Sequence, residues 1–251
     1  MIRLKSREEI GRIREAGVIL ADTIREVARM IRPGVQTADL DRETRRLIEG
    51  RGAQPSFLGY LDYPASACIS VNDQVIHGIP GQRRLDAGDL VKLDIGVELH
   101  GFYADAAWTF GVGEVSAARR DLMRVTRECL DIAVKAARGG ARIHDIGRAV
   151  QTHAEGLGYG VVRQFCGHGV GFAQHEDPQV PNYVSRGPNP RLKPGMVIAL
   201  EPMITIGTWE VEVLEDGWTV RTLDRSDSAH YEYTVAILDG GADVLTPIRD
   251  L

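Results

Sequence analysis

Two aspartates lie inside a stretch that reads as a buried β-hairpin, where ionised carboxylates are costly to place. Residues 90–110, LVKLDIGVELHGFYADAAWTF, alternate apolar and polar positions about a turn, which predicts two paired strands. With the turn centred between Leu99 and His100, Asp94 lies directly opposite Asp105, with Cβ atoms about 4.5–5.5 Å apart. Two like charges in this position repel each other unless a cation or a proton lies between them.

A second pair of carboxylates is predicted in the C-terminal part of the chain. Asp216-Gly217 is a two-residue hairpin signal, and extending its register along both arms places Glu201 opposite Glu232. Pro202 and the polar stretch 224–228 could insert a bulge into these arms. A single acid on a strand is usually solvated, but two facing pairs suit two divalent cations about 3.5–4 Å apart, bridged by a carboxylate.

Such a metal site also calls for a nitrogen ligand, and three histidines lie in suitable loops. His168 stands between two glycines in the run FCGHGVGFAQHEDPQVP, which also holds His175. Glycines on both sides allow the backbone to approach its neighbours closely. His77 lies beside a turn in VNDQVIHGIPG. Each histidine taken alone is more typical of an ordinary loop, so the hypothesis depends on the whole set.

Four amphipathic helices are expected to frame these strands. Ser6 and Glu9 form a capping box, and apolar residues then recur at helical spacing up to Pro33-Gly34. The other three expected helices run from Thr37 to Gly50, from Ser116 to Gly139-Gly140, and from about Ile143 to Leu157.

The order of elements recurs along the chain. A shift of 106 residues aligns segments 32–52 and 138–158 with seven identical residues, and with one added residue AGDLVKLDIG (87–96) parallels PGMVIALEPM (194–203). The alternative is that two helical hairpins simply resemble each other. We favour one domain, 1–251, with half-lobes of approximately 1–110 and 111–251. The expected fold is α+β, an antiparallel sheet covered by helices with internal pseudo-twofold symmetry.

Composition narrows the class of protein. The chain has 251 residues, of which 43% are apolar, and a net charge of −5, which argues against neutralisation of nucleic-acid phosphates. Three scattered cysteines fit a reducing compartment rather than a disulfide framework. The charged N-terminal stretch fits neither a signal peptide nor a membrane span. We therefore expect a cytoplasmic protein without membrane or nucleic-acid function.

A family resemblance joins these residues. The ordered set Asp94, Asp105, His168, Glu201 and Glu232 resembles the five metal ligands of the pita-bread metallopeptidases. Further motifs resemble those of type I methionine aminopeptidases: GYxxYPxxxCISVNDQVIHGIP, LDIGVELHGFYAD, CGHGVG, LKPGMVIALEPM, EDGWTVRTLDRS and HYEYT. The similarity covers nearly the whole chain. It implies removal of the initiator methionine from nascent polypeptides, with a preference for a small second residue.

The resemblance also implies roles for individual residues. Asp105 and Glu232 would bridge two divalent ions (Co, Mn, Fe or Zn), Asp94 would complete one metal site, and His168 with Glu201 would complete the other. The ions would activate a water and polarise the first peptide carbonyl. His175 would stabilise the oxyanion, His77 would contact the scissile amide, and Glu201 would shuttle a proton. The methionine pocket would comprise Phe57, Tyr60, Tyr63, Cys68, His77 and Trp218.

One position departs from the family pattern. Gln174 stands where many relatives have an aromatic residue directly before His175, and Phe172 is a candidate replacement for that pocket wall.

The resemblance also implies an oligomeric state and a place of action. The implied enzyme is a monomer that meets its substrates near the ribosome.

Three alternatives remain. Prolidases and Xaa-Pro aminopeptidases would keep the same five ligands, but they resemble this chain only in the C-terminal half of a longer polypeptide. Type II methionine aminopeptidases are disfavoured because His168 and Glu201 are only 33 residues apart. A non-catalytic binding protein of this fold would be expected to have lost ligands, and all five are present.

Overall fold

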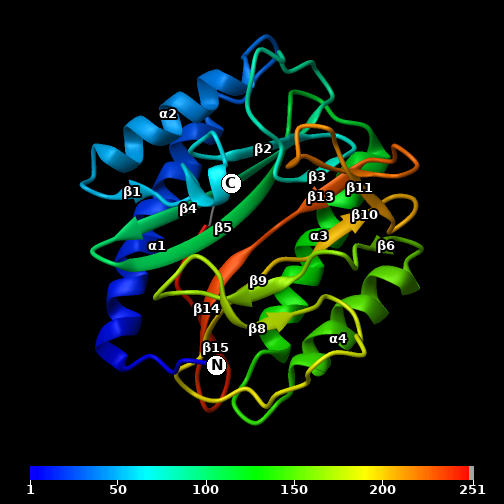
Figure 1. Ribbon diagram of the computed structural model, residues 1–251. Coiled ribbons are helices and arrows are strands. Elements are labelled where there is room, and N and C mark those ends of the chain that lie inside the picture. The colour runs from blue at the N-terminus through cyan, green and yellow to red at the C-terminus, as the bar shows by residue number, and fades with distance from the viewer. Residues whose placement is uncertain (249–251) are drawn as a thin grey trace.

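The computed structural model of the protein describes residues 1–248. The first two α-helices cover strands of the first half, and the other two cover strands of the second half (Figure 1). Helix α1 packs against β4 and β5, and α3 packs against α4 and against strands of the second half. The helices of the described residues are α1 Arg7–Ala28, α2 Thr37–Glu49, α3 Ala117–Ala136 and α4 Ile143–Gly156, with a short 3-10 helix at Tyr60–Asp62. All four expected α-helices are confirmed.

The strands form antiparallel sheets. In the first half, β4 pairs with β1, β2 and β5. The strands of the first half are β1 Gln54–Pro55, β2 Cys68–Val71, β3 Gln74–Ile76, β4 Leu90–Leu99 and β5 Phe102–Gly111. In the second half the sheet orders are β15-β14-β9-β7-β8 and β13-β10-β6, while β11 and β12 pair with β3 of the first half. These strands are β6 Gly160–Val161, β7 Gly167–Gly169, β8 Glu176–Val180, β9 Val197–Leu200, β10 Met203–Thr205, β11 Val211–Val213, β12 Val220–Thr222, β13 Ser228–His230, β14 Tyr233–Ile237 and β15 Ala242–Val244.

The repeat seen in the sequence is visible in the backbone. Gln36 and Arg142, which are 106 residues apart, both precede a helix whose third residue, an aspartate, accepts a bond from their backbone N–H. Each also makes an isolated bridge, Gln36 to Arg84 and Arg142 to Arg191. The α+β architecture with two related halves is therefore confirmed.

The predicted register of the first hairpin was wrong by two residues. Asp94 pairs with Ala107, and Asp105 pairs with Gly96. The cause lies in the turn, because His100 and Gly101 both have positive φ (52° and 84°) and form a two-residue turn between Leu99 and Phe102. A shift of two residues keeps every side chain on its face, so the two aspartates still share one face as diagonal neighbours.

The register predicted for the second pair of arms is confirmed on both sides of the two glutamates. Leu200 pairs with Tyr233, and Met203 pairs with His230. Glu201 lies between β9 and β10, and Glu232 lies between β13 and β14. The pairs that flank them keep the predicted register, so the possible bulge around Pro202 does not shift it.

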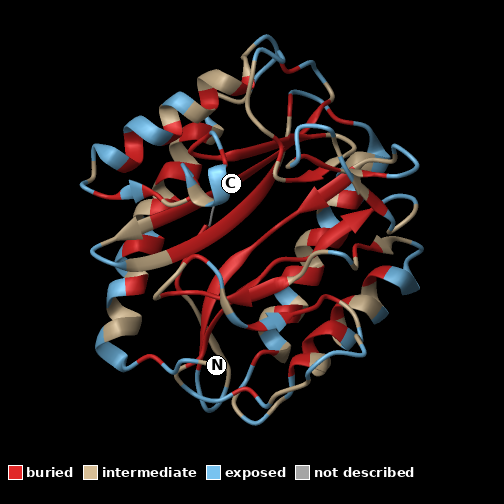
Figure 2. Cartoon of the chain, viewed as in Figure 1, coloured by how far each residue is buried: buried red, intermediate tan, exposed pale blue. Residues whose placement is uncertain are grey.

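Hydrogen bonds connect the two halves where the acids lie. Backbone N–H of Glu232 donates to Ala107 O at 2.8 Å, and that of Asp105 donates to Thr234 Oγ1 at 2.9 Å. The central strands are mostly buried, whereas the outer faces of the helices are exposed (Figure 2). The central strands therefore hold the four acids at positions that are at least nine-tenths buried.

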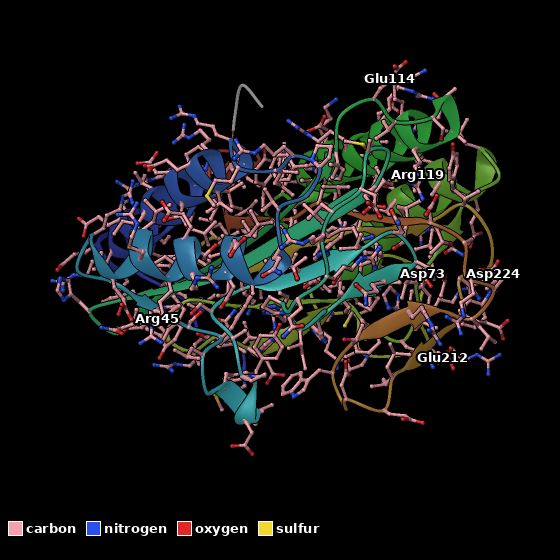
Figure 3. The ribbon with its side chains drawn as sticks, turned by 90° about the horizontal axis from the view of Figure 1, so that it is seen from above. Arg45, Asp73, Glu114, Arg119, Glu212 and Asp224 are labelled. Atoms are coloured by element: carbon pink, nitrogen blue, oxygen red, sulfur yellow. The ribbon has the colours of Figure 1, made fainter. Side chains whose placement is uncertain are left out.

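The surface is charged but of mixed sign. Side chains such as Arg45, Glu212 and Asp224 project from the outside of the molecule (Figure 3). Arg45 pairs with Glu49, and Glu212 pairs with Arg221, each at 2.7 Å. No helix among the described residues has the length and apolar character needed to cross a membrane.

Candidate metal centre

A cavity of about 730 Å³ lies between the two halves of the protein. Strands and loops of both halves contribute to its wall. The structure brings every predicted site residue to this cavity: Phe57, Tyr60, Tyr63, Cys68, His77, Asp94, Asp105, His168, His175, Glu201, Trp218 and Glu232.

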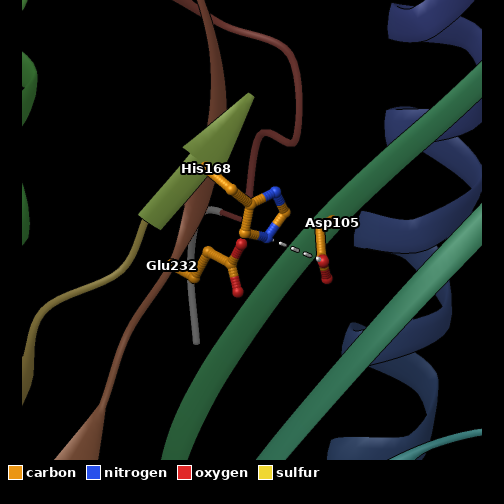
Figure 4. A group of neighbouring side chains, drawn as sticks. All are labelled: Asp105, His168 and Glu232. Atoms are coloured by element: carbon orange, nitrogen blue, oxygen red, sulfur yellow. Dashed lines mark ion pairs between the residues drawn. The ribbon is translucent and has the colours of Figure 1, made fainter. Parts of the chain in front are cut away.

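Three of these residues form a compact cluster. Ligand atoms of Asp105, His168 and Glu232 all lie within 4.8 Å of one another (Figure 4). His168 Nε2 lies 3.8 Å from Asp105 Oδ2 and 3.5 Å from Glu201 Oε1. Asp94 lines the same cavity and adds a carboxylate from β4.

The glycines beside His168 allow β7 to fit between its neighbours. A Cβ on Gly167 would lie 2.3 Å from Ala199 O, and one on Gly169 would lie 2.2 Å from Asp177 O. Both distances are far below van der Waals contact, so any larger residue would push β7 away from β8 or β9. The expected close backbone approach is confirmed.

The tautomer of His168 leaves one ring nitrogen free for a ligand. Its Nδ1 lies 2.9 Å from Gly169 O, and only an N–H can bond to a carbonyl oxygen. Burial is the main cause that lowers the pKa of His168 to about 3, so the ring is neutral. The lone pair of Nε2 therefore faces the carboxylates, as in a metal-binding histidine.

Burial also shifts the four acids. It raises the pKa of Asp94 to about 7 and that of Glu201 to about 8. The pKa values of Asp105 and Glu232 rise as well, first through burial and then through the neighbouring carboxylates. Without a cation the group must hold protons, because several negative charges cannot share one low-dielectric site.

The acids also carry oxygen atoms without partners. Asp94 Oδ1, Asp105 Oδ1 and Glu232 Oε1 are buried and have no hydrogen-bond partner in the described part of the chain. A buried carboxylate oxygen normally has a partner. Hard oxygen donors with one imidazole nitrogen suit divalent ions such as Mn²⁺, Fe²⁺, Co²⁺ or Zn²⁺. The residues present thus fit a divalent metal centre.

The two other histidines lie beside this cluster. The His175 ring stacks on Tyr60 with centroids 5.2 Å apart, and its Nδ1 lies 2.9 Å from the Tyr60 hydroxyl. Its centroid is 4.2 Å from that of His168. Burial lowers the pKa of His77 to about 4, so this ring is neutral at pH 7. His77 packs edge-on against Trp218.

An apolar pocket adjoins the carboxylates. Phe57, Tyr63 and Cys68 form one buried cluster, with Trp218 packed against it. The rings of Tyr63 and Trp218 meet edge to face with centroids 5.0 Å apart. The Tyr63 hydroxyl donates to backbone carbonyls, at 3.0 Å from Gly78 O, which fixes that ring. Phe57 lines the cavity as well as the core.

Phe172 does not replace the missing aromatic wall. Its ring lies under the Arg3 guanidinium at 4.0 Å and is not among the residues that line the cavity. Gln174 is buried and bonds to Asp105 and Ser56. Of the two possibilities that the sequence left open for Phe172, the structure supports the one without substitution, because the ring faces Arg3 and Lys5 of the N-terminal segment.

Sequence reasoning missed one residue at the centre. His230 is 1% exposed, and neither of its ring nitrogens has a hydrogen-bond partner within the described residues. Its Nε2 lies 3.9 Å from both Glu201 Oε2 and Glu232 Oε2. The sequence did contain one indication of this position. His230 lies two residues before Glu232, and residues two apart in an extended segment point to the same face.

Comparisons with known proteins agree with this chemistry. The family model "Metallopeptidase family M24" matches residues 11–239. A methionine aminopeptidase of Clostridium perfringens is 48% identical over 99% of this chain and 100% of its own length.

Solved structures give the same result. A Thermotoga maritima methionine aminopeptidase has a TM-score of 0.95 and 41% identity, covering 98% of this chain and 99% of that one. A prolidase from Pyrococcus furiosus has a TM-score of 0.80 and 25% identity, and the match covers 98% of this chain and 66% of the prolidase. The common fold is the pita-bread fold, while the sequence is closer to the aminopeptidases. This chain belongs to metallopeptidase family M24 and, within it, to the methionine aminopeptidases of bacterial type.

Proposed function

We propose that this protein is a metal-dependent aminopeptidase that removes the initiator methionine from nascent polypeptides and prefers a small second residue. The observation that supports this most is the cavity itself. It joins four buried carboxylates and a neutral histidine to an apolar pocket bounded by aromatic rings and a thiol. A hydrolytic centre beside a pocket for one side chain suits an exopeptidase.

Two divalent ions would be held by the acids and His168. Asp105 and Glu232 would bridge them, Asp94 would complete one site, and His168 with Glu201 would complete the other. The unpartnered oxygens of Asp94, Asp105 and Glu232 support these assignments. Bound Co, Mn, Fe or Zn would supply a Lewis acid and an acidified water at the scissile carbonyl.

The remaining polar groups would manage charge and protons. His175 would donate a hydrogen bond to the developing oxyanion, and its contact with the Tyr60 hydroxyl sets the ring orientation. His77 would contact the scissile amide. Once a bound ion has displaced its proton, the Glu201 carboxylate would accept a proton from the attacking water and pass it to the leaving amine.

The pocket would hold the methionine side chain and exclude water. Tyr60 and His77 would contribute to its rim, and the buried cluster of Phe57, Tyr63 and Cys68 would form its base. Trp218 would close one side through its contact with Tyr63. A fixed wall of aromatic rings favours one long, unbranched side chain over bulkier ones.

We further propose that residues 1–251 form one catalytic domain, with half-lobes of approximately 1–110 and 111–251. A hydrophobic cluster that contains residues of both halves supports this. The enzyme would act as a cytoplasmic monomer that meets substrates at the ribosome. The three cysteines, which are free thiols, fit a reducing compartment.

The direct test is release of free methionine from the peptide Met-Ala-Ser by metal-free protein to which Co²⁺ or Mn²⁺ is added. Release that depends on the added ion is the expected result. No release with any divalent ion would overturn the proposal. Faster release of the first residue from Xaa-Pro peptides than from Met-Ala-Ser would instead favour a proline-directed peptidase.

A further inference from the structure

Gln174 makes a polar contact to one of the candidate metal ligands. Its side chain is buried, with 2% of the residue exposed. Its Nε2 donates a hydrogen bond to Asp105 Oδ2, and its Oε1 accepts one from the Ser56 hydroxyl at 2.5 Å. The ionised form of Asp105, which is the form that binds a metal, only accepts hydrogen bonds, so the amide presents its NH₂ group to it. The hydroxyl then satisfies the amide oxygen, and a single orientation of Gln174 serves both neighbours.

The loop that carries Gln174 is anchored close to Asp105. Tyr103, two residues before Asp105 on β5, donates its backbone N–H to Gly171 O at 2.8 Å. The Glu176 carboxylate accepts two backbone N–H bonds from the same loop and pairs with Lys5 Nζ at 2.7 Å. Both side chains of that ion pair are buried. The loop therefore delivers the amide to Asp105 from a fixed backbone.

The residue opposite Asp105 leaves room for this contact. Gly96 pairs with Asp105 across the β4–β5 ladder, and its carbonyl accepts a bond from Ser56 N at 3.0 Å. A Cβ on Gly96 would lie 2.1 Å from Ser56 Oγ and 2.9 Å from Gln174 Oε1. Ser56 and Gln174 thus occupy the volume that a side chain at position 96 would need.

The two carboxylate oxygens of Asp105 differ in their hydrogen bonding. Oδ2 is held by Gln174, whereas Oδ1 has no hydrogen-bond partner among residues 1–248. Gln174 is not among the residues that line the cavity, so it acts on Asp105 rather than on the substrate side chain. We propose that Gln174 is a positioning residue that fixes the Asp105 carboxylate for metal binding.

This inference rests on the proposed metal centre. A hydrogen bond to a metal-binding carboxylate orients it, and loss of such a partner typically weakens metal affinity about 10–100-fold. The role differs from that of a pocket wall, which would change the recognition of methionine and leave metal affinity unaltered.

The test compares wild-type protein with Gln174→Met, which keeps an unbranched side chain of similar size but removes the donor. Calorimetric titration of the metal-free proteins with Mn²⁺ should show a dissociation constant about 10-fold higher in the variant. The visible absorption spectrum of the cobalt-loaded variant should also differ, because it reports the ligand geometry. At saturating metal, the KM for Met-Ala-Ser should change little.

A second variant, Ser56→Ala, keeps Gln174 but removes the hydroxyl that orients it. A smaller loss of Mn²⁺ affinity is expected, and this variant carries the test if Gln174→Met does not fold. Thr126→Val is the matched control, because it removes a buried hydroxyl that donates to Leu122 O in α3, away from the cavity. Its Mn²⁺ affinity should equal that of the wild type.

Unchanged Mn²⁺ affinity and an unchanged cobalt spectrum in a folded Gln174→Met variant would overturn this inference but leave the proposed metal centre intact. If Gln174→Met does not fold, unchanged affinity in Ser56→Ala would overturn it. A higher KM with unaltered metal affinity would also overturn it, because Gln174 would then be a pocket residue. A wild-type protein that binds no divalent ion would overturn the metal centre itself and this inference with it.

Discussion

His168 Nε2 lies 3.5 Å from Glu201 Oε1, so a neutral imidazole faces a buried acid across the cavity. Burial lowers the pKa of His168 to about 3 and raises that of Glu201 to about 8. At neutral pH the metal-free pair therefore consists of an unprotonated ring and a protonated carboxyl. A divalent ion would replace that proton, which couples metal binding to pH.

The stability of the metal-free protein should depend on pH through Glu201. Its pKa in the folded protein is about 8, whereas an unfolded glutamate has a pKa of about 4.3. Between these values the folded state holds a proton that the unfolded state has released. The stability that this group contributes is thus complete below about pH 4 and is lost as the pH rises through about 8.

The measurement is thermal unfolding of metal-free wild type and Glu201→Gln across this range. The stability of the wild type should fall relative to that of Glu201→Gln as the pH rises. Saturating Mn²⁺ should abolish this pH dependence. Glu8→Gln, on the exposed face of α1, is the control and should follow the wild type. A difference that does not vary with pH would contradict the assigned protonation of Glu201.

Replacement of His168 by alanine should abolish turnover without unfolding the protein. The ring supplies the one nitrogen of the compact cluster, and its hydrogen bond goes to the carbonyl of the adjacent Gly169 rather than to a distant segment. Release of methionine and circular dichroism would be measured on the same sample. His153→Ala is a matched control, because that ring pairs with Glu128 between α3 and α4. Activity retained in His168→Ala would refute its role as a ligand.

Trp218→Ala should weaken the recognition of methionine. Loss of the ring opens the pocket beside Tyr63 and removes apolar contact with the substrate side chain. We expect KM for Met-Ala-Ser to rise on the order of 10-fold or more, with metal affinity unchanged. Trp209→Ala removes a ring that packs on Arg163 instead and should leave KM unaltered. Equal effects of the two variants would exclude Trp218 from the pocket.

Gly169→Ala should disturb the strand that carries His168. The added Cβ would lie 2.2 Å from Asp177 O, and relief of that overlap requires β7 and β8 to separate. A cost of about 1–3 kcal/mol in unfolding free energy is expected, together with weaker metal binding. Gly156→Ala at the end of α4 meets no neighbour within 4 Å and should be nearly neutral. Urea unfolding of both variants checks this, and equal stability would contradict it.

For the two carboxylate pairs, the alternation of apolar residues predicted the strand faces, and the turn residues predicted the strand register. Apolar alternation fixed the face on which Asp94 and Asp105 lie, because a strand has a period of two residues. The exact pairing of the strands depends on which two residues form the turn. These are His100 and Gly101, and the positive φ of His100 was not predicted. The Glu201 and Glu232 register was predicted correctly because Asp216-Gly217 is a stronger turn signal.

Other features could not be read from one sequence. The unpartnered ring of His230 and the bond from Gln174 to Asp105 arise where distant segments meet. Local periodicity carries no information about such contacts. The placement of Phe172 under Arg3 likewise depends on how the N-terminal segment packs against the loop.

We propose that Asp94, Asp105, His168, Glu201 and Glu232 hold divalent ions in one cavity. The most direct measurement is anomalous diffraction from crystals of the protein grown with Mn²⁺. We expect two neighbouring anomalous peaks, both beside Asp105 and Glu232, one also beside Asp94 and the other also beside His168 and Glu201. Well-ordered side chains with no peak at this position, or a peak only elsewhere on the protein, would contradict it.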